Sequence, residues 1–149
     1  MPIPDPCPGL VVRYAFLWSD EAAVGRVEGS KDRPAVIVLA QERRNDGAMI
    51  VTVAPITHRP ADALRAVEIP HKVKKHLGLD DDASFIVLDE LNRFVWPGPD
   101  LRPLGRRQPG VFSYGILPLD IFHRVRDVAA RLLAERSATV LKRTDDPSS

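Results

Sequence analysis

The stretch GSKDRPAVIVLA, residues 29–40, places an arginine at the boundary between a polar segment and an apolar one. Arg33 stands directly before Pro34 and an uncharged, β-branched run. A guanidinium held by a proline and a strand offers planar, paired donors that suit phosphate oxygens. Two interpretations follow. Either Arg33, with Lys31 nearby, meets a phosphate at the edge of a groove, or Arg33-Pro34 only begins a strand and the arginine pairs with an aspartate.

Three further side chains that could contact a phosphate or transfer a proton follow the apolar run 48–56. Thr57 can donate its hydroxyl to a phosphate, and Arg59 can add a second positive charge. His58 titrates near neutral pH by default, which suits general acid–base catalysis. The alternatives are a threonine that caps a turn and an exposed histidine without a role.

Four polar residues interrupt the apolar segment 83–96. The carboxylates of Asp89 and Glu90 can take part in proton transfer or simply end a strand. Asn92 and Arg93 alternate with apolar residues, so they can contact a single strand of nucleic acid or lie on a solvated strand face. The pattern predicts a strand, a bend and a second short strand.

The elements that must position these residues are mostly short strands. Strands are expected over the apolar, β-branched runs 10–18, 34–40, 48–56, 65–69 and 83–96. The turn signal Asn45-Asp46-Gly47 makes 34–56 a β-hairpin. The polar stretch 19–32 predicts a long loop, and 71–78 predicts a helical turn closed by Gly78.

The last element is an amphipathic helix that begins at Pro118, because apolar residues recur there at helical spacing. The turn-rich segment 97–110 predicts a surface excursion, and the polar tail 142–149 is expected to fray. The order of elements predicts a single α+β domain, in which a small, curled antiparallel sheet is capped by the terminal helix.

The charge, the cysteine count and the lengths of the apolar runs limit the classes of function that the chain can have. The chain has 149 residues, a formal net charge of +1 and one cysteine, Cys7. The net charge is too small to indicate nucleic-acid binding by the whole surface, so any basic site must be local. No Cys/His spacing suggests zinc, and we expect neither a metal nor a cofactor. No apolar run approaches the roughly 20 residues that span a bilayer, and the N-terminus lacks a signal-peptide pattern. A cytoplasmic protein without a membrane partner is expected.

Several of these pieces occur together in a known family. KDRPAVIVL is followed by VTVAPIT, a later VEIP, a strand reaching Asp89 and a helix that opens with a proline. This arrangement, over residues 8–134, resembles the MazF/PemK family of toxin endoribonucleases. The resemblance implies a small SH3-like β-barrel with a C-terminal helix, as in MazF and CcdB. It also implies a homodimer that cuts single-stranded RNA without a metal and is inhibited by a cognate antitoxin protein.

The resemblance also implies roles for particular residues. The family's arginine and threonine fall on Arg33 and Thr57, and with His58 and Asp89 these make up the expected catalytic set. The residues expected to contact RNA are Lys31, Arg59, Glu90, Asn92 and Arg93. One departure matters, because the arginine that some members place two residues before the aspartate is Val87 here.

A second hypothesis belongs to another class. The chain could be a non-catalytic small-barrel binding module, or a CcdB-like toxin that targets a protein. Val87 favours this hypothesis, whereas Arg33 and Thr57 favour the nuclease. A third possibility is an unrelated small barrel in which the motif matches arose by chance.

Overall fold

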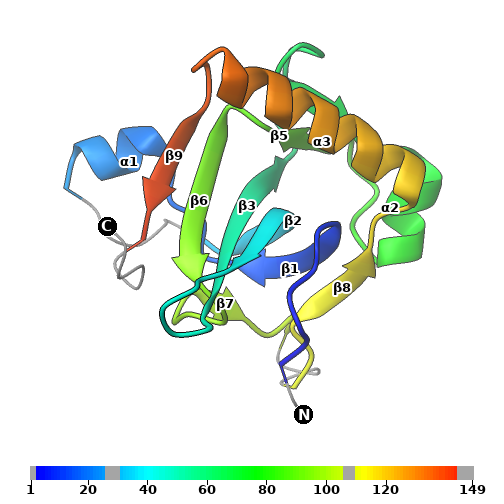
Figure 1. Ribbon diagram of the computed structural model, residues 1–149. Coiled ribbons are helices and arrows are strands. Elements are labelled where there is room, and N and C mark those ends of the chain that lie inside the picture. The colour runs from blue at the N-terminus through cyan, green and yellow to red at the C-terminus, as the bar shows by residue number, and fades with distance from the viewer. Residues whose placement is uncertain (1–2, 26–30, 106–109, 144–149) are drawn as a thin grey trace.

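The computed structural model describes residues 3–25, 31–105 and 110–143 of the chain. Within these ranges the chain forms nine strands and three helices (Figure 1). Their bounds are β1 Leu10–Tyr14, α1 Ser19–Ala23, β2 Arg33–Glu42, β3 Met49–Thr57, β4 Ala66–Glu68, α2 His71–Leu77, β5 Phe85–Val87, β6 Glu90–Val95, β7 Leu101–Arg102, β8 Ser113–Ile116, α3 Leu119–Ala134 and β9 Thr139–Lys142. The expected α+β class is confirmed.

All nine strands belong to one mostly antiparallel sheet, whose main path runs β4-β5-β3-β2-β1-β7. β5 and β6 are consecutive along one edge of β3, and β8 continues the far side of β1 beside β7. The exception to antiparallel pairing is β9, which lies parallel to β6.

The expected closed barrel is wrong. β4 and β7 stand at opposite ends of the strand order and do not pair, so the sheet stays open. α3 packs against β2 and β4, and α2 packs against β8. Figure 1 shows α3 lying along one rim of the sheet, beside β5.

The predicted β-hairpin is confirmed as β2 and β3, which pair from Ala35 opposite Pro55 to Glu42 opposite Met49. Its turn is fixed by Arg43, whose Nε donates to Asp46 Oδ1 at 3.0 Å. This hydrogen bond is the main reason that the pKa of Asp46 falls to about 2. The hairpin matters for function because it brings the start of β2 and the end of β3 to the same edge.

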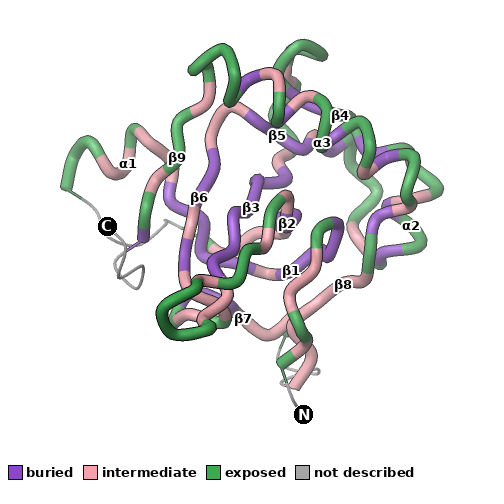
Figure 2. Tube along the Cα trace, viewed as in Figure 1, coloured by how far each residue is buried: buried purple, intermediate pink, exposed green. Residues whose placement is uncertain are grey.

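Both faces of the central strands are buried, as the purple core of Figure 2 shows. Successive residues of a strand point to opposite faces. Val36 therefore packs with the apolar side of α3, whereas Ile37 packs with Tyr14 and Phe94 on the other face. Two-sided burial explains why the runs at β2 and β3 carry no charge.

The expected helices are confirmed. α3 runs for 16 residues after Pro118, and its buried side consists of Ile121, Val125, Ala129 and Leu132. α2 ends at Gly78, which takes the left-handed conformation (φ +71°) that its position at the C-terminus requires. None of the helices in the described ranges is both long and apolar enough to cross a membrane.

Four elements were not expected from the sequence: α1, β7, β8 and β9. β7 lies inside the predicted surface excursion 97–110, and β8 follows that segment. α1 forms inside the predicted loop 19–32, where the side chain of Glu21 accepts a hydrogen bond from Trp18 N at 3.1 Å. β9 pairs with β6 just before and within the start of the predicted frayed tail, and Arg143 after it is buried. The rest of that tail, 144–149, lies outside the described residues, as do 26–30 of the loop and 106–109 of the surface excursion.

Candidate functional site

A cavity of about 660 Å³ opens where β2 begins and β3 ends. α1 and the bend between β5 and β6 supply its other walls. Most of the predicted site residues line this one cavity: Lys31, Arg33, Thr57, Arg59, Asp89 and Glu90. Antiparallel pairing explains the convergence, since the first residues of β2 lie opposite the last residues of β3.

Arg33 is the most constrained cation in the cavity. Its guanidinium carbon lies 5.2 Å from the centre of the Trp18 ring. Its Nε is buried and has no hydrogen-bond partner in the described part of the chain. Burial is the largest cause that lowers the pKa of Arg33; the negative charge of Glu21 opposes this effect and the positive charge of Arg59 adds to it. An arginine remains protonated at neutral pH, so the cavity holds a partly desolvated cation with unused donor capacity.

Thr57 closes β3 at the lip of the same cavity. Its Oγ1 accepts a hydrogen bond from the backbone N–H of Arg59 at 3.2 Å. This contact uses a lone pair of the hydroxyl and leaves its hydrogen available to a ligand. Thr57 thus combines the turn-capping role that the sequence allowed with a position in the lining of the cavity.

The opposite wall carries carboxylates that are already oriented. Glu90 Oε1 accepts a hydrogen bond from Ser19 N, at the start of α1, at 2.7 Å. Asp89 Oδ2 lies 3.1 Å from Nη1 of Arg65. The residue two places before Asp89 is the buried Val87, and the arginine that contacts Asp89 directly precedes the neighbouring strand β4. Arg65 was not among the residues expected at the site, since only the pairing of β4 with β5 brings it near Asp89.

His58 is directed away from this cavity and is not among its lining residues. Its Nε2 lies 2.8 Å from Asp80 Oδ2, and its Nδ1 lies 3.0 Å from the carbonyl oxygen of Ala83. Ser84 Oγ lies 3.3 Å from the same Nδ1, so both ring nitrogens have partners within the protein. The geometry supports a structural role for His58 and gives no support to proton transfer by His58 in the cavity.

Asn92 and Arg93 also lie away from the cavity. Asn92 is fully buried, and its amide exchanges hydrogen bonds with Leu17 N and O at 2.9 and 2.8 Å. The Asn92 side chain thus bonds the backbone of Leu17 in the way that a neighbouring strand would. No part of Asn92 is left exposed to contact RNA. Arg93 lines a separate, more apolar hollow beside Leu133 of α3. Neither position supports the predicted RNA contact at the cavity.

A group of exposed metal-ligand types occurs beside α2. Side-chain atoms of His58, Asp80 and Asp82 lie within 4.8 Å of one another. The ammonium group of the buried Lys74 already supplies a positive charge to this group of side chains. Its Nζ donates to Asp80 Oδ1 at 2.6 Å and to the carbonyl oxygen of Asp82. An ammonium neutralises the cluster, so the arrangement is explained without a cation from solution.

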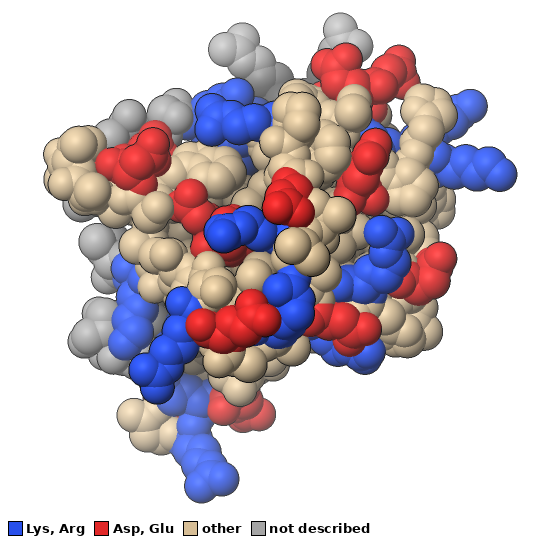
Figure 3. All heavy atoms as spheres, turned by 90° about the horizontal axis from the view of Figure 1, so that it is seen from above, with Lys and Arg blue, Asp and Glu red and all other residues tan. Residues whose placement is uncertain are grey.

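The surface charge agrees with a local site. Figure 3 shows acidic and basic side chains interleaved over one face of the molecule, without a broad surface of one sign. The cavity repeats this mixture, with Arg33 and Arg59 facing Asp89 and Glu90. Such a site can hold one or two phosphates closely, but it does not form a long electrostatic track.

No family model matches the chain, and no curated protein matches it significantly.

Proposed function

We propose that the protein is a metal-independent endoribonuclease that cleaves single-stranded RNA at the cavity between β2 and β3. One observation carries the proposal: Arg33 and Thr57, the two residues assigned catalytic roles by the resemblance, line the same cavity. The open sheet with a terminal helix is compatible with a divergent relative of MazF and PemK toxins.

The chemistry needs no group beyond those of the cavity and the RNA. The 2′-oxygen of a ribose attacks the adjacent phosphorus, the bond to the 5′-oxygen breaks, and a 2′,3′-cyclic phosphate and a 5′-hydroxyl result. Arg33 stabilises the charge that develops on the phosphoryl oxygens, and Thr57 donates to one of them. A carboxylate, Asp89 or Glu90, takes the proton from the 2′-hydroxyl and returns one to the 5′-oxygen.

The wider proposal is that this activity is the toxic half of a toxin–antitoxin pair in the cytoplasm. A homodimer and an inhibitory antitoxin belong to the same proposal. An antitoxin would inhibit by placing carboxylates against Lys31, Arg33 and Arg59, because these cations line the cavity that RNA would enter.

The test is cleavage of an unstructured RNA in the presence of EDTA. Wild-type protein should produce fragments that end in a 2′,3′-cyclic phosphate. Arg33→Ala should lower the rate by about 10²–10³, the usual loss when a preorganised donor is removed. Arg126→Ala is the matched control, because Arg126 is exposed, pairs with Asp127 and lies outside the cavity. Folded wild-type protein that cuts no RNA of varied sequence would overturn the proposal.

One observation favours the alternative of a non-catalytic binding module. Asp20 and Glu21 line the cavity together with Asp89 and Glu90, so carboxylates are as prominent there as cations. A site of this composition also suits basic side chains of a protein partner. If folded protein fails to cut RNA, this alternative becomes the leading interpretation.

A further inference from the structure

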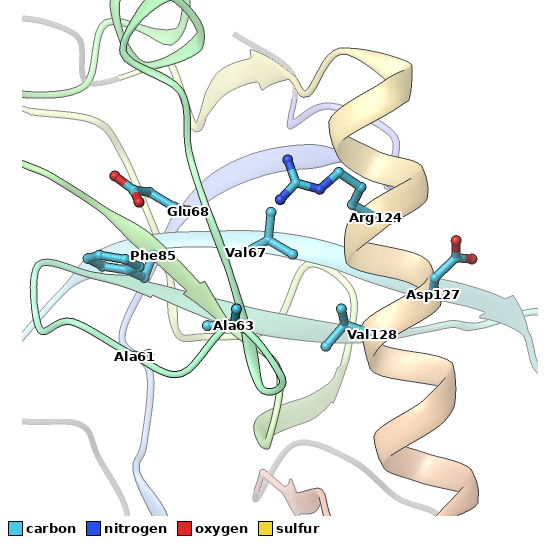
Figure 4. Close-up of a pocket in the computed structure, with 9 residues that line it drawn as sticks. Ala61, Ala63, Val67, Glu68, Phe85, Arg124, Asp127 and Val128 are labelled. Atoms are coloured by element: carbon cyan, nitrogen blue, oxygen red, sulfur yellow. The ribbon is translucent and has the colours of Figure 1, made fainter.

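A second cavity, of about 430 Å³, lies beside the first, between β4, β5 and α3 (Figure 4). Ala61 lines both cavities, so the segment that follows Arg59 is their common wall. The volume falls in the range of roughly 300–1,000 Å³ that is usual for small-molecule sites. A chain bound at Arg33 and Thr57 therefore has room for a neighbouring group just across this wall.

The second cavity has an apolar base. Val67 of β4, Phe85 of β5 and Val128 of α3 line it together with small alanine side chains. Phe85 is half-buried, and Figure 4 shows its ring beside Glu68. A half-buried aromatic ring next to open space is suited to stacking against a flat ligand.

Two side chains of opposite charge line this cavity and form no ion pair with each other. Glu68 lies on β4 and Arg124 on α3, and Figure 4 shows Val67 between them. Among the described residues, neither side chain forms an ion pair or a hydrogen bond with the other or with a third residue. Asp127, in contrast, is engaged by Arg126 at 3.1 Å. The exposed carboxylate of Glu68 and the exposed guanidinium of Arg124 thus stand at the rim of the cavity, on either side of Val67.

We propose that this second cavity binds a guanine base of the RNA strand, an inference that rests on the proposed nuclease function. Adjacent N1–H and N2–H groups of guanine match the two oxygens of the Glu68 carboxylate. Its O6 and N7 atoms are acceptors that suit the guanidinium of Arg124. The base plane stacks on Phe85. Uracil fits less well, because carbonyl oxygens flank its single N–H and would face the carboxylate.

The experiment uses short oligonucleotides of 2′-O-methyl nucleotides, which lack the attacking hydroxyl and cannot be cleaved. One is all uridine, and three others carry a single guanine, adenine or cytosine. We expect wild-type protein to bind the guanine oligomer roughly tenfold more tightly than the uridine oligomer, in line with one bidentate base contact. Glu68→Gln should abolish this preference and leave the affinity for oligouridine unchanged. Glu42→Gln is the control, since Glu42 is exposed on β2 and lines neither cavity.

The outcomes separate this inference from the proposed function. Equal affinity for all four oligomers, with binding that is lost in Arg33→Ala, would reject the guanine site alone. A preference for adenine or cytosine, or a guanine preference that survives Glu68→Gln, would also reject it. A guanine preference that depends on Glu68, in a protein that cleaves no RNA, would keep the base site and reject the nuclease. No binding of any oligomer would reject both.

Discussion

Arg65 and Asp89 form an ion pair across the edge of the sheet, with 3.1 Å between Nη1 and Oδ2. Arg65 directly precedes β4 and Asp89 directly follows β5, and these two strands pair antiparallel with Ala66 opposite Val87. The residue two places before Asp89 is the apolar Val87. In the proposed nuclease, the arginine that contacts this carboxylate therefore comes from the residue just before the adjacent strand β4.

This pair predicts a positioning role for Arg65. Arg65→Gln should change the free energy of unfolding by less than about 1 kcal/mol, because the arginine is half exposed and such pairs contribute little to stability. RNA cleavage should fall roughly ten- to a hundredfold in kcat, since Asp89 loses the contact that fixes its orientation. KM should change little, and Arg65→Lys should recover part of the rate. Unchanged kcat in Arg65→Gln would show that the pair is only structural.

A second prediction concerns the shape of the Arg33 side chain. Arg33→Lys keeps the positive charge but removes the planar fork that lies over Trp18. Cleavage should fall nearly as far as in Arg33→Ala, by about 10², while the free energy of unfolding drops by at most about 1 kcal/mol from the lost cation–π contact. Rates and urea unfolding curves of the two variants provide the test. Wild-type rates in Arg33→Lys would mean that charge alone is required there.

The convergence of Arg33 and Thr57 is the part of the site that the sequence could predict. The two residues flank a hairpin whose turn is visible as Asn45-Asp46-Gly47, and antiparallel pairing alone brings the outer ends of a hairpin together. The orientation of His58 could not be predicted in this way. It depends on Asp80 and on the Ala83 carbonyl, which belong to a segment distant in the sequence. The residue pattern around His58 therefore does not indicate these partners.

The buried end of the chain shows a similar limit. Arg143 sits in a polar sequence that resembles a frayed tail, yet only 2% of its side chain is exposed. Its partners, Asp100 and Asn92, come from segments far away in the chain. A charged residue is buried only where partners compensate its desolvation. Local composition contains no information about such partners, so neither β9 nor the burial of Arg143 could be predicted.

Removal of Arg143 should therefore destabilise the fold. Its Nη2 lies 3.1 Å from Asp100 Oδ2, and its Nη1 donates to Asn92 Oδ1 at 2.9 Å and to Ala15 O at 2.8 Å. Arg143→Met should lower the free energy of unfolding by about 3–5 kcal/mol, because it leaves the buried carboxylate of Asp100 with only the more distant Arg102, 4.0 Å away. Arg126→Met, at an exposed pair, should stay within about 0.5 kcal/mol of wild type. Similar urea midpoints for both variants would contradict the structural role.

The ion pair between Lys74 and Asp80 predicts how stability depends on acid. Lys74 Nζ, on a side chain that is 2% exposed, donates to Asp80 Oδ1 at 2.6 Å, and His58 Nε2 lies 2.8 Å from the other oxygen. The hydrogen bond from Lys74 is the largest cause that lowers the pKa of Asp80 below its ordinary value of 3.8. The folded carboxyl thus binds a proton less readily than the unfolded one. Its stabilising effect is complete above the ordinary pKa and is lost as the pH falls through the lower, folded value.

Asp80→Asn should lower the free energy of unfolding at pH 7 by about 1–3 kcal/mol, the usual contribution of a hydrogen bond between charged groups. The difference from wild type should shrink as the pH falls below 3.8, because acid protonates the wild-type carboxyl and removes the same charge. Urea unfolding at a series of pH values from neutral to strongly acidic measures this convergence. Asp127→Asn, at an exposed pair on α3, is the control for the loss of a surface carboxylate and should stay within about 0.5 kcal/mol of wild type at pH 7. A gap between Asp80→Asn and wild type that stays constant into strong acid would show that the carboxylate charge does not stabilise Lys74.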